Sequence, residues 1–408
     1  MDRRRKHMVR WKLVSIIVLV GLTLFVLLNF DTRYKDKQNL SIETEVPATK
    51  KINDKTDTVK EVKQSLAIKC IVMVDERLGF IFEENDILRT IDGGKTWSEV
   101  TPAKYSIGKL PDGIVYDFIN CNLGWIVIGN TDELKAIILK TADGGQTWDV
   151  KELNGIRNVA ALDFIDQNNG WLMANTDGAL GSEVVEIFYT KDGGDNWIKI
   201  MTNEPDKETL GALPFAGHKY GISFRDIKTG WIVVDCSGAD ERMFYITRDG
   251  GYTWHAEELP IPKEMELLNA DLHISLPKFF SDKEGVFWGV FLEDTKDKSK
   301  IVFFQTKDGG ATWKSSIPIT VSGKFMIDFI NLQEGWIISD QYIYKTKNGA
   351  RHWEQITTDI NLKGNVKFTL VNSNIGWITR QDTSKSGTWH LYKTNDSGYT
   401  WSEIEIKK

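Results

Sequence analysis

Hydrophobic and polar positions divide the chain into three parts. The stretch from Leu13 to Phe30 is apolar and carries no charge. At about 1.5 Å per residue, a helix of this length just crosses a hydrocarbon core of roughly 30 Å. Residues 31–66 are polar and lack hydrophobic periodicity, which predicts a flexible tether. From residue 67 to residue 408, short alternating apolar runs separated by Gly, Asp and Asn predict β-strands joined by turns.

The third part contains one motif seven times. TIDGGKTW at Thr90 recurs as TADGGQTW, TKDGGDNW, TRDGGYTW and TKDGGATW, and then as TKNGARHW and TNDSGYTW. In such a tight turn the Asp side chain accepts hydrogen bonds from backbone N–H groups, and Gly adopts the positive φ angle that the turn requires. The residues expected to hold these turns together are Asp92, Asp143, Asp192, Asp249, Asp308, Asn348 and Asp396. The sixth copy has Asn348, Ala350 and His352 at motif positions, so we expect its turn to be distorted.

A second motif precedes each turn by roughly 20 residues and ends in Gly-aromatic, as in DFINCNLGW from Asp117 to Trp125. The pattern also predicts four short strands in each unit, and the seven units over residues 67–408 average about 49 residues. That length is typical of propeller blades, which bury both faces of each sheet only by packing radially. The sequence therefore predicts an all-β fold, a seven-bladed β-propeller of four-stranded antiparallel blades preceded by one transmembrane helix. Twelve of the fifteen tryptophans fall in the two motifs, and we expect them to pack between blades.

Charge places this propeller relative to a membrane. The net charge is −6, although residues 1–12 contain six basic residues and one acidic residue. A basic segment before an apolar span favours a cytoplasmic N-terminus. We therefore expect a basic tail at 1–12, a retained anchor at 13–30, a tether at 31–66 and an extracytoplasmic propeller at 67–408, in a single-pass cell-membrane protein; cleavage of the apolar segment as a secretory signal is the alternative. The acidic body argues against nucleic acid as a partner.

The turns resemble the Asp-box (BNR) repeats shared by sialidases, xyloglucanases, sortilin-type receptors and the photosystem II stability/assembly factor family. The resemblance covers residues 67–408, and the short repeats are most similar to the assembly-factor-like proteins. That similarity implies a seven-bladed ring that binds partner proteins and catalyses nothing. The box is a structural turn in all of these families, so the resemblance specifies the fold far better than the function.

Loop lengths indicate where a binding site was added. We compared the distance along the chain from each box tryptophan to the aromatic residue of the next Gly-aromatic motif. It is 27 residues from Trp197 to Phe224 and 25 from Trp254 to Phe279, but only 15 or 16 in three other repeats. These insertions belong to neighbouring blades four and five, on the face opposite the Asp boxes. The candidate binding residues on that face are Phe215, His218, Tyr220, Asp235, Asp240, Glu241, Arg242, Glu264, Glu266, Asp271 and His273.

Two functions remain open for this face. The first is a non-catalytic binding or assembly module with a protein partner. The second is a carbohydrate-active enzyme, a glycoside hydrolase or sialidase-like protein, in which Asp235 and Glu264 or Glu266 would supply a carboxylate pair. The few arginines do not form the cluster that a sialidase needs, and we name no catalytic residue. A structural spacer without ligand would leave the insertions unexplained.

Cofactors and metals are not expected. DGGxTW lacks the alternating oxygen ligands of a calcium loop. His218 and His273 are better explained as loop histidines than as a metal pair. Cys70, Cys121 and Cys236 are expected to be free and mostly buried thiols, because the second and third lie on opposite faces.

Overall fold

The computed structural model describes residues 68–83, 86–102, 114–130, 134–156, 158–179, 181–207, 210–235, 244–266, 271–292, 298–382 and 388–406. These all belong to a compact unit that spans Leu66–Lys408. The expected basic tail, the anchor at Leu13 to Phe30 and the tether lie outside the described residues. Within the described ranges, no helix combines the length and the apolar character that crossing a membrane requires.

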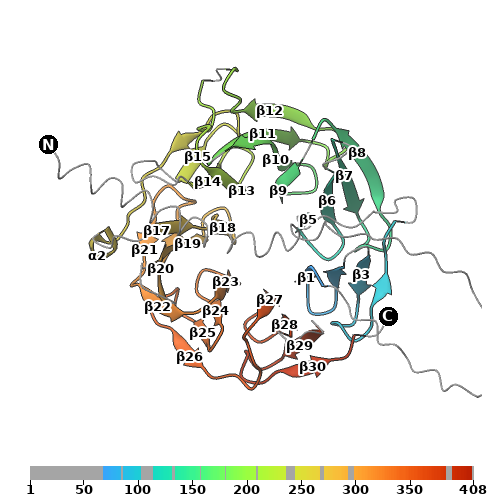
Figure 1. Cartoon of the computed structure of the whole chain (residues 1–408), viewed down its shortest axis with the longest axis vertical. Helices are drawn as coiled ribbons and strands as arrows, with labels where there is room; N and C mark the ends of the chain where they lie inside the picture. Colours follow the sequence, from blue (N-terminus) through green and yellow to red (C-terminus); the bar gives the residue numbers. More distant parts are fainter. Residues whose placement is uncertain are drawn as a thin grey trace, which may run out of the picture. The chain divides into compact units, whose positions relative to one another are not determined.

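Seven antiparallel sheets, counted over the described residues, are arranged radially in a ring (Figure 1). Their strands follow one another in chain order from the centre of the ring to its rim. The first three blades are β1 (Cys70–Met73), β2 (Gly79–Phe82), β3 (Ile87–Thr90), β4 (Ser98–Glu99); β5 (Ile114–Phe118), β6 (Gly124–Asn130), β7 (Lys135–Thr141), β8 (Asp149–Asn154); and β9 (Asn158–Phe164), β10 (Gly170–Ala179), β11 (Ser182–Thr190), β12 (Ile198–Thr202).

The remaining blades repeat this order, with additions in the fifth. They are β13 (His218–Phe224), β14 (Gly230–Asp235), β15 (Phe244–Thr247), β16 (His255–Ala256); β17 (Asp271–Ile274), β18 (Lys278–Phe279), β19 (Gly285–Leu292), β20 (Lys298–Thr306), β21 (Lys314–Ser315), β22 (Ile319–Ser322); β23 (Phe325–Phe329), β24 (Gly335–Ser339), β25 (Ile343–Thr346), β26 (Glu354–Ile356); and β27 (Asn365–Leu370), β28 (Gly376–Gln381), β29 (Trp389–Thr394), β30 (Ser402–Ile404). A short helix, α2 (Lys263–Glu266), precedes β17.

The seven-bladed antiparallel propeller expected from the sequence is confirmed, but blade five departs from four strands. Its inner strand is divided into β17 and β18, which both pair with β19. Pro277 lies between them and has no N–H to continue the ladder. At the rim, β22 adds a second outer segment on β20, beside β21. The sheet therefore contains six strands.

The Gly-aromatic motif explains the register of the two inner strands. Phe164 on β9 pairs with Gly170 on β10, and Trp171 follows on the same strand. A Cβ at Gly170 would lie 2.4 Å from Cδ1 of Phe164, so only glycine admits the ring across it. The same pairing joins Phe118 to Gly124 in blade two. The motif is thus a fixed cross-strand contact at the start of the second strand.

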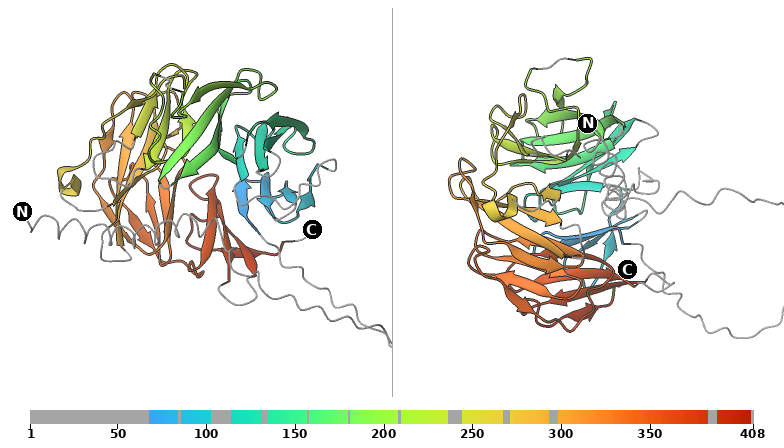
Figure 2. Two further views of the ribbon diagram at one scale, coloured as in Figure 1. Left: turned by 45° about the horizontal axis from the view of Figure 1, so that its top comes forward. Right: turned by 60° about the vertical axis from the view of Figure 1, so that its left-hand side comes forward.

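The core consists of seven hydrophobic clusters, each between two neighbouring blades of the described ring. All twelve motif tryptophans contribute to these clusters, and five of them have 1% or less of their surface exposed. In the cluster between the last and first blades, Trp377 packs with Ile71 and Trp97. Among the described strands none is exchanged between the two ends of the ring, which therefore meet by packing (Figure 2).

Each Asp box lies on the same side of the ring as the turn between the first and second strands. In blade one the N–H of Gly93 donates to the carbonyl of Arg77 at 2.9 Å, and the equivalent bond recurs in all seven blades. The blade-to-blade connections and the loops between second and third strands are left for the opposite side, which we call the loop face. This is the side on which the sequence placed the insertions.

Candidate functional site

The Asp boxes are built as closed turns. In box five, Oδ1 of Asp308 accepts the Thr306 hydroxyl at 2.8 Å and the Thr312 N–H at 2.9 Å. Its Oδ2 accepts the Thr312 hydroxyl at 2.6 Å. The Thr312 hydroxyl and N–H together lower the pKa of Asp308 to about 2. The three hydrogen bonds of the Asp308 carboxylate are all within the turn, which suits a structural role.

Box six keeps the backbone turn, contrary to the expected distortion. Asn348 Oδ1 accepts the Thr346 hydroxyl at 3.1 Å and the His352 N–H at 3.0 Å. Ala350 adopts φ of 59°, the left-handed conformation that Gly takes in the other boxes. An amide oxygen can replace the carboxylate as acceptor, and Asn348 therefore preserves the fold of the turn.

A belt of polar contacts joins neighbouring inner strands, and the sequence analysis missed it. It uses the residue just before each motif aromatic. The contacts are Asp117 Oδ2 with the Phe164 N–H at 2.6 Å, Asp163 Oδ2 with the Phe224 N–H at 2.5 Å, the Ser223 hydroxyl with the Pro277 carbonyl at 2.7 Å, and Lys278 Nζ with Asp328 Oδ1 at 2.6 Å. Desolvation raises the pKa of Asp117 to about 6. Desolvation and the charge of Asp117 raise the pKa of Asp163 to about 8.

Four of the residues expected to bind a partner come together on the loop face of blades four and five. Asp235, at the end of β14, is the centre of this group. Its Oδ2 accepts the Tyr220 hydroxyl at 3.3 Å and lies 3.5 Å from Nδ1 of His273. The His218 ring, on β13, lies 6.5 Å from the Tyr220 ring. We call these four residues, His218, Tyr220, Asp235 and His273, the loop-face cluster.

The electrostatics of the loop-face cluster favour hydrogen bonding. The contact with His273 keeps the pKa of Asp235 below its usual range, so Asp235 is an anion at neutral pH. Burial, followed by the charge of Asp235, raises the pKa of Tyr220 above its usual range. Tyr220 is therefore a neutral phenol and a donor rather than a nucleophile. Nε2 of His273 is buried and has no hydrogen-bond partner among the described residues.

Lys219 of blade four and Glu183 of blade three together hold the blade-four insertion in place beside this cluster. We call these contacts the Lys219 clamp. Lys219 has 3% of its surface exposed, and its Nζ donates to the carbonyls of Glu183, Phe215, Ala216 and Gly217 at 2.7–3.1 Å. Glu183 Oε2 in turn accepts the Lys219 N–H at 2.8 Å. The insertion is therefore pinned at the end where the cluster begins.

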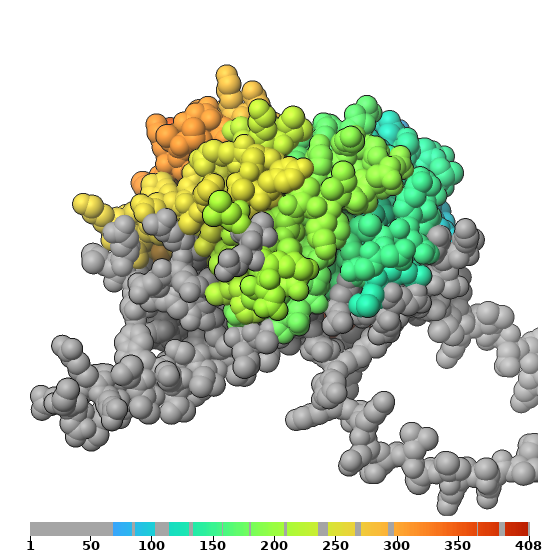
Figure 3. Space-filling view, turned by 90° about the horizontal axis from the view of Figure 1, so that it is seen from above, coloured from blue at the N-terminus to red at the C-terminus, as the bar shows by residue number. Residues whose placement is uncertain are grey.

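The rest of the insertion packs where blades three and four meet, because Leu213 belongs to the hydrophobic cluster between them. Asn203 is buried and donates to the carbonyls of Glu183 and Pro214, both at 2.9 Å. Leu213 enters the core, whereas Leu210 is 95% exposed. The third to fifth blades, green to orange in Figure 3, form one continuous surface at this part of the rim.

The other candidate residues are more dispersed. Phe215 is 40% exposed, next to the Lys219 clamp. Glu264 is exposed on α2, Glu266 ends that helix, and Asp271 is exposed at the start of β17. Asp240, Glu241 and Arg242 lie outside the described residues. No described contact joins Asp235 to Glu264.

Thiols and metal ligands add little to this site. Cys70 is half-buried and Cys121 is exposed, so the expectation of mostly buried thiols is wrong for Cys121, which lies in a turn at the surface. Both are free, and Cys236 lies outside the described residues. Across the described ranges, no three His, Cys, Asp or Glu side chains are placed to hold a metal ion.

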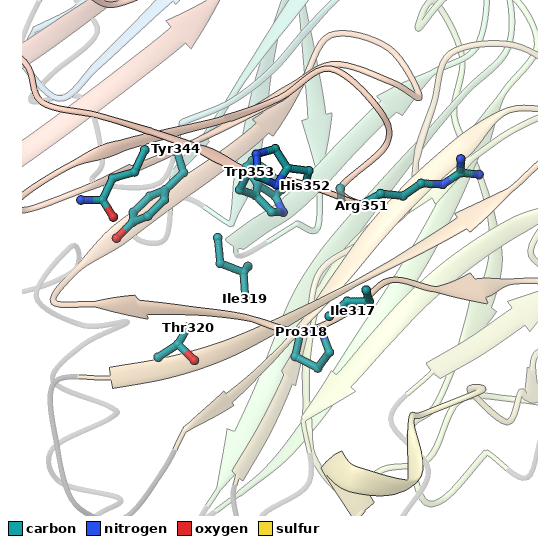
Figure 4. Close-up of a pocket in the computed structure, with 10 residues that line it drawn as sticks. Ile317, Pro318, Ile319, Thr320, Tyr344, Arg351, His352 and Trp353 are labelled. Carbon is teal, nitrogen blue, oxygen red and sulfur yellow. The ribbon is translucent and has the colours of Figure 1, made fainter.

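A separate groove of about 320 Å³ lies at the rim between blades five and six (Figure 4). Ile317, Pro318 and Ile319 form one wall, just before and within β22. The other wall comes from Tyr344 and from the end of box six, where Arg351, His352 and Trp353 lie in sequence.

Comparison with known proteins agrees with this architecture. Residues 291–408 match the family model described as "Photosynthesis system II assembly factor YCF48", which confirms the resemblance inferred from the repeats. A solved structure of YCF48 from Cyanidioschyzon merolae is similar at 14% identity and a TM-score of 0.51, over 78% of this chain and 94% of the other. The GH74 xyloglucanase from Xanthomonas campestris is similar at 13% identity and a TM-score of 0.52, over 84% of this chain and 55% of the other.

A structure titled "YCF48 bound to D1 peptide" is similar at 17% identity and a TM-score of 0.49, over 85% of this chain and 93% of the other. No curated protein sequence matches the chain. Residues 35–318, more than half of the chain, match the model described as "DUF6242 beta propeller domain". The chain therefore belongs to the DUF6242 beta propeller domain family.

Proposed function

We propose that this chain is a membrane-anchored, extracytoplasmic binding module that recognises a protein partner through the loop face of blades four and five. The observation that carries the proposal is the loop-face cluster. A phenol donor, an anionic carboxylate and a histidine from three strands converge there at the surface. The group therefore presents hydrogen-bond donors and acceptors at fixed positions on the surface, which suits recognition of polar groups on a partner.

The surroundings of the cluster support a protein as the partner. Tyr220 is 47% exposed, and Phe215 lies close by in sequence with 40% exposed. Aromatic side chains with a polar tip are enriched in protein interfaces because they bury much area at small entropic cost. The Lys219 clamp fixes the backbone from Phe215 to Gly217. Binding would then cost little ordering entropy.

The match to an assembly factor model over residues 291–408 is consistent with a binding role. The matched region lies in the last blades, so the family match and the loop-face cluster support the proposal independently. The membrane anchor rests on the sequence from Leu13 to Phe30 and on the basic residues before it.

Affinity capture from cross-linked membranes tests this function. The full chain should capture a near-stoichiometric protein, and Tyr220→Ala together with His273→Ala should abolish that capture. Tyr252→Ala serves as the control, because Tyr252 is 53% exposed on the Asp-box side of the same blade. Equal capture by the cluster variant and the control would refute the location, and absence of any captured protein would refute the function.

A carbohydrate-active enzyme remains the competing proposal, because Tyr220 lies near two carboxylates, Asp235 and Glu183. A glycosidase needs one of two carboxyls as an acid and the other as a base or nucleophile. Here Glu183 already accepts the backbone N–H of Lys219, and Asp235 accepts from Tyr220. Hydrolysis of xyloglucan or a sialoside by the wild-type chain, lost in Asp235→Asn, would favour the enzyme.

A further inference from the structure

Box six differs from the other boxes in a way that frees a side chain. In the other six boxes the residue before the box tryptophan donates its side-chain group to the box carboxylate at 2.6–2.8 Å. His352 occupies this position in box six, and only its backbone N–H contacts Asn348. Within the described residues the imidazole makes no hydrogen bond, and it lines the rim groove instead.

The same substitutions change the charge of the groove. The other six boxes carry an aspartate where box six has the neutral Asn348. Arg351 is exposed beside it, so its positive charge has no box carboxylate to offset it. At this edge of the groove the charged side chain is therefore the cation of Arg351. An anionic group is the complement of such an edge.

Blade five supplies the apolar half of the groove. Ile317 is 73% exposed, and Ile319 begins β22, the strand segment that only this blade adds among the described sheets. Together with Tyr344 and Trp353 these residues form walls that accept an apolar side chain. Two departures from the repeat, the extra strand and the altered box, therefore meet at one place (Figure 4).

We propose that this rim groove binds an extended segment of a partner protein in which an apolar side chain lies next to Asp or Glu. The apolar side chain enters between Ile317 and Trp353, and the carboxylate faces Arg351 and His352. A peptide is favoured over a sugar because β22 and β26 are outer strands, each paired within the described sheets on one side only. Such open edges offer backbone N–H and C=O groups to an extended chain. This site is separate from the loop-face cluster and goes beyond the function proposed there.

The test selects random peptides displayed on phage against the detergent-solubilised full chain, and then measures their affinities by fluorescence anisotropy. Selected peptides should carry an aliphatic or aromatic residue within two positions of an acidic residue. Ile317→Asp and Arg351→Glu should each weaken binding at least tenfold, equivalent to about 1.4 kcal/mol. The effect of Arg351→Glu should shrink at high salt because the groove is exposed.

Matched variants separate recognition from folding. Lys95→Glu changes the equivalent position of box one, and Ile227→Asp changes an isoleucine that is 53% exposed elsewhere. Both should bind like the wild type. Asn348→Asp with His352→Thr restores the common box, so it should fold at least as well and still lose peptide binding. Selection of no peptide, equal loss in the controls, full binding by the restored box, or displacement of peptides by a glycan from an array would each overturn the proposal.

Discussion

The seam between the last and first blades is the one place where described neighbouring sheets are not consecutive in the chain, and Trp377 lies in it. The indole is fully buried, and its Nε1 donates to the carbonyl of Gly93 in box one at 3.1 Å. Trp377→Phe removes this donor and leaves that buried carbonyl unpaired, at a cost of about 1–3 kcal/mol. The smaller ring also removes the equivalent of roughly two methylenes, about 0.8 kcal/mol each. We expect a loss of about 3 kcal/mol in the free energy of opening this seam.

Trp171→Phe is the matched control, because Trp171 donates to the carbonyl of Gly250 at 2.9 Å between blades three and four. Those blades are joined by the clamped insertion, so they reclose readily. Hydrogen exchange of the full chain should show amides of β1 and β27 exchanging about a hundredfold faster in Trp377→Phe. If exchange at that seam is unchanged, or is equally fast in both variants, closure does not depend on the contact between Trp377 and box one.

Three further substitutions test contacts described above. The pKa of Asp163 is about 8 in the folded protein, so the folded state keeps a proton that an unfolded aspartate releases near pH 4. The free energy of unfolding, measured by urea titration, should therefore fall as the pH rises from about 4 to about 8. Asp163→Asn should make this free energy less dependent on pH. Lys219→Met removes a charged donor from four carbonyls and should cost roughly 1.5–3 kcal/mol, with faster proteolysis of residues 203–217; unchanged proteolysis would contradict the clamp. Ala350→Gly should stabilise the chain by about 1 kcal/mol, measured as a higher midpoint of thermal unfolding, because Ala350 has φ of 59° and glycine adopts this conformation without strain; a lower midpoint would contradict it.

The repeats in the sequence were enough to predict the fold. The box and the Gly-aromatic motif predict four strands per unit, as six of the seven described blades have, because each motif specifies a local turn or a cross-strand pair. They also fix which loops share a face, since antiparallel strands alternate their connections. Loop lengths pointed to the loop face of blades four and five, where His218, Tyr220, Asp235 and His273 lie close together in the structure.

What the sequence did not show depends on contacts between distant residues. Glu183 supports the site from blade three, 36 positions before Lys219, and no unusual loop marks it. The role of Asp163 was hidden although its motif was noted, because its partner is a backbone N–H in the next blade. The box-six turn survives because the amide oxygen of Asn348 accepts two of the bonds that the aspartate accepts in the other boxes, which a comparison of motif letters does not reveal.

Site-specific photocross-linking tests the central claim most directly. A photoreactive phenylalanine analogue placed at position 220 lies on the loop face, and one at position 252 lies on the Asp-box side of the same blade. Both are irradiated in intact membranes that contain the full chain. The proposed function predicts one discrete protein adduct from position 220, lost with His273→Ala, and none from position 252. Adducts from both positions alike, or from position 252 alone, would contradict recognition through the loop face of blades four and five.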